Sequence, residues 1–200
     1  MSKKKHHFKR PLNQKFYRPT MLIICEGETE YYYFSSFRAH ASVEQGEVGN
    51  SMTFVTNAIK TKNRIQKKKE IKFDQTWLVF DRDETDEGDF QKSIRKAEEE
   101  GCKVAYSNQA FDYWFLLHFH DHNGNPMDRS QYKGILDRNL PFPYDKTEKT
   151  LQKMYSELIS TQDKAIVRAT KIYNGKENGK QHTESVSTVH KLVDELNKYN

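Results

Sequence analysis

A short apolar segment that ends in two aspartates constrains the fold of this chain more than any other feature. Thr76–Phe80 is rich in β-branched and aromatic residues, and it runs directly into Asp81, Arg82 and Asp83. So short an apolar run is typical of a strand buried on both faces in a parallel sheet. If the chain stays extended, Asp81 and Asp83 point to the same side, where their mutual repulsion favours a bound cation such as Mg²⁺. The alternative is a turn with a helix cap, because aspartate is common in both.

Apolar segments alternate with helical segments along the first part of the chain. The predicted strands cover residues 21–25, 51–55, 76–80 and 103–107, and the predicted helices cover residues 28–38, 57–69, 89–100 and 110–120. In the third helix Phe90, Ile94 and Ala97 share one face, and Gly101 ends the helix. This order predicts an α/β fold with a mainly parallel sheet of about four strands, flanking helices and right-handed crossovers.

The composition changes twice along the chain, and we expect three regions. They are a basic disordered tail (1–18), an α/β domain (19–123), and a loop and helical extension packed on the same domain (124–200). Within the extension, residues 121–144 are rich in loop-forming residues. A capping-box pattern from Asp145 to Glu148 predicts a helix that ends near Ile159. Two more helices are expected over residues 163–173 and 183–199, with a polar loop over 174–182.

The net charge of +5 is distributed unevenly. Residues 1–20 contain seven Lys and Arg and no acid, and residues 60–72 contain seven more beside one glutamate. The candidate nucleic-acid-binding residues in the second segment are Lys60, Lys62, Arg64, Lys67, Lys68 and Lys69. Such segments can neutralise phosphates and release counterions, so the sequence favours a nucleic-acid partner. A solvated tail and a solubilising helix face are the simpler alternative.

Several function classes lack their sequence signals. No apolar run approaches the roughly 20 residues of a membrane-spanning helix, and the basic N-terminus lacks the apolar core of a signal peptide. Cys25 and Cys102 do not make a disulfide framework or a zinc site, so we expect a cytoplasmic protein without a membrane partner. The chain has no P-loop and no nucleophile-elbow motif.

Acidic residues follow two of the predicted strands. In an open parallel sheet, ligands gather beyond the carboxyl ends of the strands, where Glu26 follows the first strand and Asp81 and Asp83 follow the third. Glu30 would share a helical face with Glu26 if the helix began there. Gly27 would let the backbone turn sharply or approach a phosphate closely. Four acids converging in this way favour a metal ion.

These residues carry a resemblance to a known family. Residues 22–30 (LIICEGETE) and 80–83 (FDRD) look like a Toprim active site, in which a glutamate follows one strand and DxD follows another. The longer match is to the RloB-like family of bacterial abortive-infection proteins. It includes the 107–119 block (SNQAFDYWFLLHF) and the 185–193 block (SVSTVHKLV) and extends from about Thr20 to Leu196. Asp112 stands where the family pattern has glutamate.

The resemblance implies a Toprim-like domain that cleaves phosphodiester bonds with Mg²⁺, for which Mn²⁺ can substitute. It also implies a role in anti-phage defence and an ATPase partner. The expected metal ligands are Glu26, Asp81 and Asp83. Glu30 joins them as a catalytic residue, either at a second metal or as general base. The sequence leaves open whether the substrate is DNA or RNA.

The supporting residues expected around this site are Gly27, Asn108, Asp112 and His118. For His118, which lies on an aromatic helix, a packed and hydrogen-bonded histidine is the more common situation. The alternative to a nuclease is a Toprim-like module that binds nucleic acid or docks an ATPase without chemistry. Loss of a suitable Glu30 geometry would favour this alternative.

Overall fold

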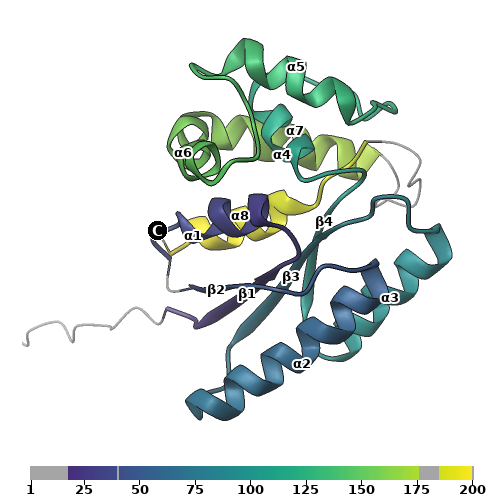
Figure 1. Cartoon of the computed structure of the whole chain (residues 1–200), viewed down its shortest axis with the longest axis vertical. Helices are drawn as coiled ribbons and strands as arrows, with labels where there is room; N and C mark the ends of the chain where they lie inside the picture. Colours follow the sequence, from purple (N-terminus) through teal and green to yellow (C-terminus); the bar gives the residue numbers. More distant parts are fainter. Residues whose placement is uncertain (1–17, 40, 176–184, 200) are drawn as a thin grey trace, which may run out of the picture.

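Four parallel strands form the sheet at the centre of the computed structural model, which describes residues 18–39, 41–175 and 185–199 (Figure 1). The strands are β1 (Met21–Cys25), β2 (Ala41–Gln45), β3 (Gln75–Asp81) and β4 (Lys103–Ser107). Their order across the sheet is β2-β1-β3-β4. Every residue of β1 and the central five residues of β3 are buried, as their apolar sequences predict. The predicted α/β fold class is therefore confirmed.

Helices cover both faces of the sheet. The α-helices are α1 (Glu28–Ser35), α2 (Ser51–Lys69), α3 (Glu87–Glu99), α4 (Asp112–Phe119), α5 (Ser130–Asn139), α6 (Glu148–Leu158), α7 (Gln162–Gly175) and α8 (Val189–Asn197). A 3-10 turn over Ile159–Thr161 joins α6 to α7. Helices α2 and α3 lie on one face, and α1 and α8 lie on the other (Figure 1). Helices α4 to α7 form a layer beyond α1 and α8.

An aromatic cluster fixes α1 against α4. The ring of Tyr33 contacts those of Phe111 and Phe115, with centroid distances of 5.8 and 5.5 Å and edge-on geometry. Such pairs add to the free energy gained by burying the rings themselves. Because Glu30 is on α1 and Asp112 is on α4, this packing determines how closely their carboxylates approach each other.

The prediction of the second strand, over residues 51–55, is wrong. Residues 51–55 form the first turns of α2, and β2 instead lies over residues 41–45, where no strand was predicted. The Asn50 side chain caps α2 by accepting a hydrogen bond of 2.9 Å from the Thr53 amide. Phe54 and Val55 then belong to the buried face of the helix. β2 forms because its backbone pairs in register with β1, although its own side chains are only half-buried.

Three details of the predicted extension also differ. Helix α5 lies inside the expected loop, where Tyr132 and Leu136 are buried at helical spacing. The capping box does not form, because Thr147 is the N-cap of α6 and Asp145 accepts from the Thr147 amide. Helix α8 begins later than predicted, since residues 186–188 hydrogen-bond to the end of β4 through Asn108 and Tyr106.

Some predictions lie outside the described residues or are not tested by the fold. The structure does not describe residues 1–17, which are most of the tail, or residues 176–184, which include most of the polar loop predicted over 174–182. The division into domains at residues 19–123 and 124–200 stays a prediction. Within the described ranges, no helix is both long enough and apolar enough to cross a membrane.

Candidate functional site

The site is at the point where the strand order of the sheet reverses. Strands β1 and β3 are neighbours, and their crossovers lead to β2 on one side and to β4 on the other. Such a switch point leaves a crevice beyond the carboxyl ends of the strands. Glu26 directly follows β1, and Asp81 is the last residue of β3. The predicted strand-end location of both acids agrees with the structure.

Glu26 is buried at this crevice. Its Oε2 atom accepts a hydrogen bond from the Asp81 backbone amide at 3.4 Å, which ties the end of β1 to the end of β3. Burial raises the pKa of Glu26, although the backbone amides of Asp81 and Gly49 partly offset this effect by donating to the carboxylate. The side chain is therefore held in place, but its charge is poorly compensated.

Asp81 has one carboxylate oxygen that accepts a hydrogen bond from the described residues and one that does not. Its Oδ2 atom accepts from the Phe111 amide at 3.0 Å. Its Oδ1 atom is buried and has no hydrogen-bond partner among the residues that the structure describes. Burial, followed by the charges of Glu30 and Asp83, raises the pKa of Asp81 well above its usual range. An ionised Asp81 is thus costly unless a cation meets Oδ1.

Asp83 does not reach the crevice in the way that the sequence suggested. The strand ends at Asp81, and Asp83 adopts a left-handed backbone conformation with φ of 48°. The prediction of two side chains on the same side of an extended chain is therefore wrong. The Asp83 carboxylate is 54% exposed and forms an ion pair with Arg129 at 3.3 Å. It still lines the same cavities as Glu26 and Asp81.

Glu30 lies in the first turn of α1 and is buried. Helix α1 begins at Glu28, so Glu26 is outside the helix and the expected shared helical face does not exist. Glu30 approaches Gly27 closely: a Cβ atom at residue 27 would lie 2.6 Å from Glu30 Oε2. The glycine therefore makes room for a carboxylate of the protein itself. Burial raises the pKa of Glu30 to about 7, and Lys146 opposes this shift.

Asp112 extends the acidic group from α4. Its Oδ1 atom accepts a 2.7 Å hydrogen bond from the Tyr144 hydroxyl, and its Oδ2 atom is 3.1 Å from Lys146 Nζ. The Asp112 charge contributes to the raised pKa values of Glu30 and Asp81. Asp112 is thus next to the predicted catalytic carboxylates, where it holds a lysine that the sequence analysis did not single out.

The predicted catalytic carboxylates surround one cavity. Glu26, Glu30, Asp81 and Asp83 line a space of about 320 Å³ together with Lys146. A second cavity of about 580 Å³, lined by Glu26, Asp81 and Asp83, continues toward the start of α2 and the Thr85 turn. Within the described ranges, no three His, Cys, Asp or Glu side chains already stand in an arrangement that could hold a metal ion. Asp83 is engaged by Arg129, and Glu30 is folded back toward Gly27.

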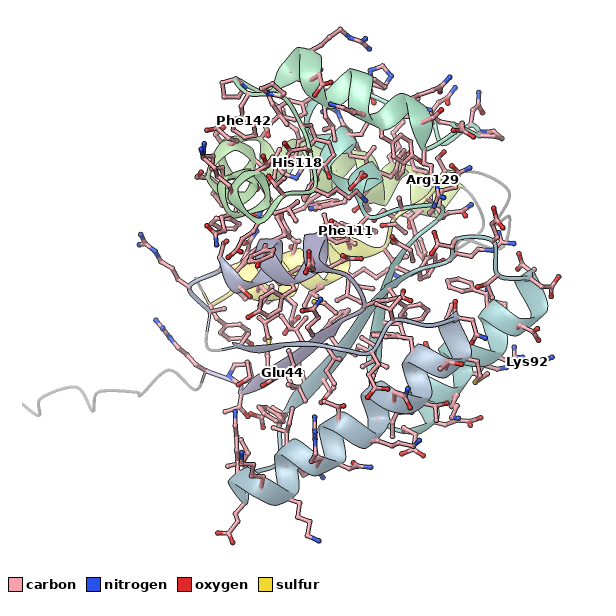
Figure 2. The ribbon with its side chains drawn as sticks, viewed as in Figure 1. Glu44, Lys92, Phe111, His118, Arg129 and Phe142 are labelled. Carbon is pink, nitrogen blue, oxygen red and sulfur yellow. The ribbon has the colours of Figure 1, made fainter. Side chains whose placement is uncertain are left out.

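The predicted supporting residues His118 and Asn108 differ in their position. His118 is buried between α4 and the end of α6, where Nδ1 is 3.1 Å from the Leu158 carbonyl oxygen (Figure 2). Burial lowers its pKa to about 3, as expected for a packed neutral histidine. Asn108 is also buried, and its backbone amide donates to the carbonyl oxygen of Val186. His118 therefore packs the extension against α4. Asn108 instead follows β4 at the carboxyl edge of the sheet, next to the residue that pairs with Asp81, and its supporting role stays a prediction.

The basic residues of α2 lead away from the acids. Ser51, at the start of α2, lines the cavity with Glu26. At about 1.5 Å per residue, Lys69 is ~27 Å further along the helix, near the amino edge where β3 begins. Lys62 donates to the Glu100 carbonyl, and Lys60 donates to Asn57. The predicted nucleic-acid-binding residues are therefore not gathered at the crevice.

Two cations near the acids were missed by the sequence analysis. Arg129 lies in the segment that reads as a loop, Lys146 lies in the predicted capping box, and no spacing rule links either residue to the acidic motifs. Only the packing of the extension on α1 and α4 brings them to Asp83 and Asp112. Figure 2 shows Arg129 close to the loops that leave the sheet, well apart from His118.

Comparison with known proteins places the chain in one family. Searches of curated proteins and of solved structures found no match. The family model described as RloB-like protein matches residues 21–196 of the 200-residue chain. This span begins at β1 and ends in α8, so it covers the sheet, the acidic crevice and the helices that bring Arg129 and Lys146 to it. The chain therefore belongs to the RloB-like family, to which its motifs already pointed.

Proposed function

We propose that this protein is a metal-dependent nuclease that hydrolyses phosphodiester bonds in DNA or RNA. The observation that carries the proposal is the buried Oδ1 atom of Asp81, which lacks a partner among the described residues and lies at the switch point beside Glu26. A buried carboxylate oxygen without a partner is costly, and a divalent cation would remove this cost.

The donor set fits Mg²⁺, with Mn²⁺ as a substitute. Glu26, Asp81 and Asp83 offer hard carboxylate oxygens, and Mg²⁺ binds to a few such ligands while keeping several waters. Asp83 would have to leave Arg129, which its half-exposed side chain permits. When bound, such an ion lowers the pKa of a water and neutralises charge that develops on phosphate oxygens.

The remaining residues would handle the proton and hold the site in shape. Glu30 would accept the proton of the attacking water, because its carboxylate lines the same cavity as the proposed metal ligands. Gly27 leaves the space that this carboxylate occupies. Tyr144 fixes Asp112, and Asp112 in turn holds Lys146 near Glu30.

Membership of the RloB-like family supports two further parts of the proposal. These are a role in anti-phage defence and an ATPase partner that controls the activity. The test is expression in growing cells, alone and with the neighbouring gene, beside a Glu26→Gln control. Protection from phage that needs both genes and an intact Glu26 would support this role. No protection in either setting would contradict it.

A non-catalytic module that binds nucleic acid or docks an ATPase is the alternative function. The ion pair between Arg129 and Asp83 favours it, because this pair occupies a proposed metal ligand. The decisive experiment is incubation of DNA, transfer RNA and messenger RNA with the protein in Mg²⁺, Mn²⁺ or EDTA. Cleavage that requires metal and disappears in Glu26→Gln supports the nuclease. Binding without cleavage in all conditions supports the module.

Metal binding can be measured apart from activity. Asp81→Asn should weaken Mn²⁺ binding in calorimetric titrations and should raise the melting temperature of the metal-free protein, because one of several repelling carboxylates is removed. Asparagine retains an oxygen for the Phe111 amide, so the fold should survive. Unchanged Mn²⁺ affinity in both Asp81→Asn and Glu26→Gln would remove the metal site from the proposal.

A further inference from the structure

Two basic side chains of the extension reach the acidic crevice from different directions. Arg129 directly precedes α5 and pairs with Asp83, and Lys146 precedes α6 and pairs with Asp112. Both also line one cavity of about 550 Å³ that opens beside Asp81. The charged groups of Arg129 and Lys146 therefore lie at the rim of the proposed active site, although the two residues are far apart in sequence.

The backbones that carry these side chains are firmly anchored. The Arg129 amide donates to Gln109 Oε1 at 2.9 Å, and nearby Met127 donates to Ser185 Oγ at 3.1 Å. On the other side, the backbone of Tyr144, two residues before Lys146, donates to Asp137 and accepts from Lys133. The Tyr144 hydroxyl holds Asp112, the partner of Lys146. The side chains themselves are 63% and 58% exposed. Each cation thus has a fixed base and a head that is free to exchange one partner for another.

Strained backbone conformations occur at the same carboxyl edge of the sheet. Asp83 and Gln109 both have positive φ angles, of 48° and 72°, although neither is a glycine. They follow the neighbouring strands β3 and β4, and both contact Arg129. Residues in such conformations cost free energy and gather at ligand-binding sites. Arg129 therefore bridges two strained turns at the carboxyl edge of the sheet.

The charge balance of the cavity determines what these cations can do. Asp81, Asp83, Asp112 and Asp128 line it together with only two cations. Without metal, both cations are engaged by acids, and the surplus of carboxylates repels a phosphate. A divalent cation on Asp81 and Asp83 would displace Arg129 and reverse this balance. The cavity should then accept a phosphate, but only in the metal-loaded protein.

We propose that Arg129 and Lys146 act as a phosphate clamp: they neutralise Asp83 and Asp112 in the metal-free protein, and they bind backbone phosphates of the nucleic acid once metal is present. Arginine suits this exchange because its planar guanidinium pairs equally well with carboxylate and phosphate. This inference rests on the proposed nuclease function and identifies the residues that grip its substrate. The lysines at the far end of α2 have no part in the clamp.

Binding of fluorescein-labelled DNA and RNA oligonucleotides is the test. Anisotropy titrations compare wild type, Arg129→Gln and Lys146→Gln in Ca²⁺, in Mg²⁺ and in EDTA, and cleavage is followed in Mg²⁺. Arg129→Lys and Lys146→Arg test for rescue by charge. Lys198→Gln is the matched control, because Lys198 is a half-exposed lysine that is ion-paired with Glu195. Glu195 also contacts Gln75 at the amino edge of the sheet.

The clamp predicts that each Gln variant weakens metal-dependent oligonucleotide binding, or raises KM, by about tenfold. In EDTA the variants should match wild type, and Mn²⁺ affinity in calorimetry should be unchanged or higher, because a competing cation is gone. Recovery in the Lys and Arg variants, with no effect of Lys198→Gln, would complete the support. A role limited to stabilising the fold predicts none of this metal dependence.

The outcomes separate the clamp from the nuclease. If wild type cleaves but both Gln variants bind and cleave equally well, the clamp is wrong and the nuclease stands. If the Gln variants lose metal-dependent binding but no protein cleaves anything, the clamp stands and the nuclease is wrong. If wild type binds no oligonucleotide in any metal, both are overturned.

Discussion

The two edges of the sheet carry positive charge of different kinds. At the amino edge, α2 ends in Lys67, Lys68 and Lys69, which are adjacent in sequence and exposed. At the carboxyl edge, Arg129 and Lys146 stand alone in sequence, and each is paired with an acid of the proposed site. The first group concentrates positive charge at the end of one helix, and the second group is held by ion pairs beside the acidic crevice.

This difference predicts two separate roles, which are long-range attraction of nucleic acid and positioning of one phosphate. Exposed lysines ~27 Å from the crevice can draw a polyanion to the protein, and salt screens this attraction. Cations that share a cavity with buried carboxylates can instead position one phosphate for reaction. We therefore expect changes at the carboxyl edge to alter catalysis and changes at the amino edge to alter only affinity.

The largest effect should follow from a change at the carboxyl edge. Glu26→Gln should lower the cleavage rate at saturating substrate at least about a hundredfold, or about 2.7 kcal/mol of transition-state stabilisation. Glutamine keeps an oxygen for the Asp81 amide but removes the charge that a metal needs. Single-turnover cleavage in Mg²⁺ is the measurement, and Lys198→Gln is the control. Activity within a fewfold of wild type would exclude Glu26 from the catalytic site.

Two buried histidines should lose their contribution to the free energy of unfolding in acid. The pKa of buried His118 is lowered to about 3, and that of His190 to about 4, mainly by burial. The unfolded chain takes up these protons first, near pH 6.5, so the stability present above that pH is lost as pH falls toward 3–4. Each histidine contributes up to about 1.4 kcal/mol per pH unit. Urea unfolding in EDTA between pH 7.5 and 5 measures the total slope. Glu30, whose pKa is raised to about 7, contributes to this slope in the opposite direction, so the histidine contribution is the difference between wild type and His118→Gln.

A single substitution tests the source of that slope. His118→Gln should reduce the pH dependence, because glutamine can donate to Leu158 without becoming charged. His120→Gln, at an exposed position of the same segment, should leave it unchanged. Equal slopes in all three proteins would mean that His118 does not set the acid sensitivity of the extension.

A smaller effect should follow from crowding Glu30. In Gly27→Ala the new Cβ meets Glu30 Oε2 at 2.6 Å, so the carboxylate has to move. We expect about tenfold slower cleavage, or about 1.4 kcal/mol. The melting temperature should change little, because φ of −110° suits alanine and the clash is with a flexible end. Gly175→Ala is the control, since no atom lies within 4 Å of its added Cβ. An unchanged rate would show that the position of Glu30 is not critical.

Local patterns predicted much of this molecule, and long-range packing determined the rest. The strands β1, β3 and β4 follow from apolar runs, and Glu26 and Asp81 follow from where those runs end. The edge strand β2 was missed because pairing with β1 determines it. The turn at Asp83 was only the alternative to an extended chain, and a hydrogen bond from the Thr85 amide to the Arg82 carbonyl closes it. Nucleic-acid binding by the α2 lysines stays a prediction, and their distance from the acids could not be predicted, because a charge run reveals nothing about which edge of the sheet it reaches.

The smallest effect should follow from a change at the amino edge. Replacing Lys67, Lys68 and Lys69 with glutamine should lower oligonucleotide affinity only a fewfold near physiological salt, where distant charges are screened. If all three contact phosphates, the slope of log K against log [salt] should flatten by about 0.7 to 0.9 for each lost contact. The cleavage rate at saturating substrate should change far less than in Gly27→Ala.

The measurement pairs salt-dependent anisotropy with single-turnover cleavage of the same oligonucleotide. A flattened slope with an intact rate would establish that this edge attracts nucleic acid without taking part in chemistry. A lost rate would contradict the separation of the two edges, because it would require the substrate to span both. An unchanged slope would mean that these lysines are only solvated.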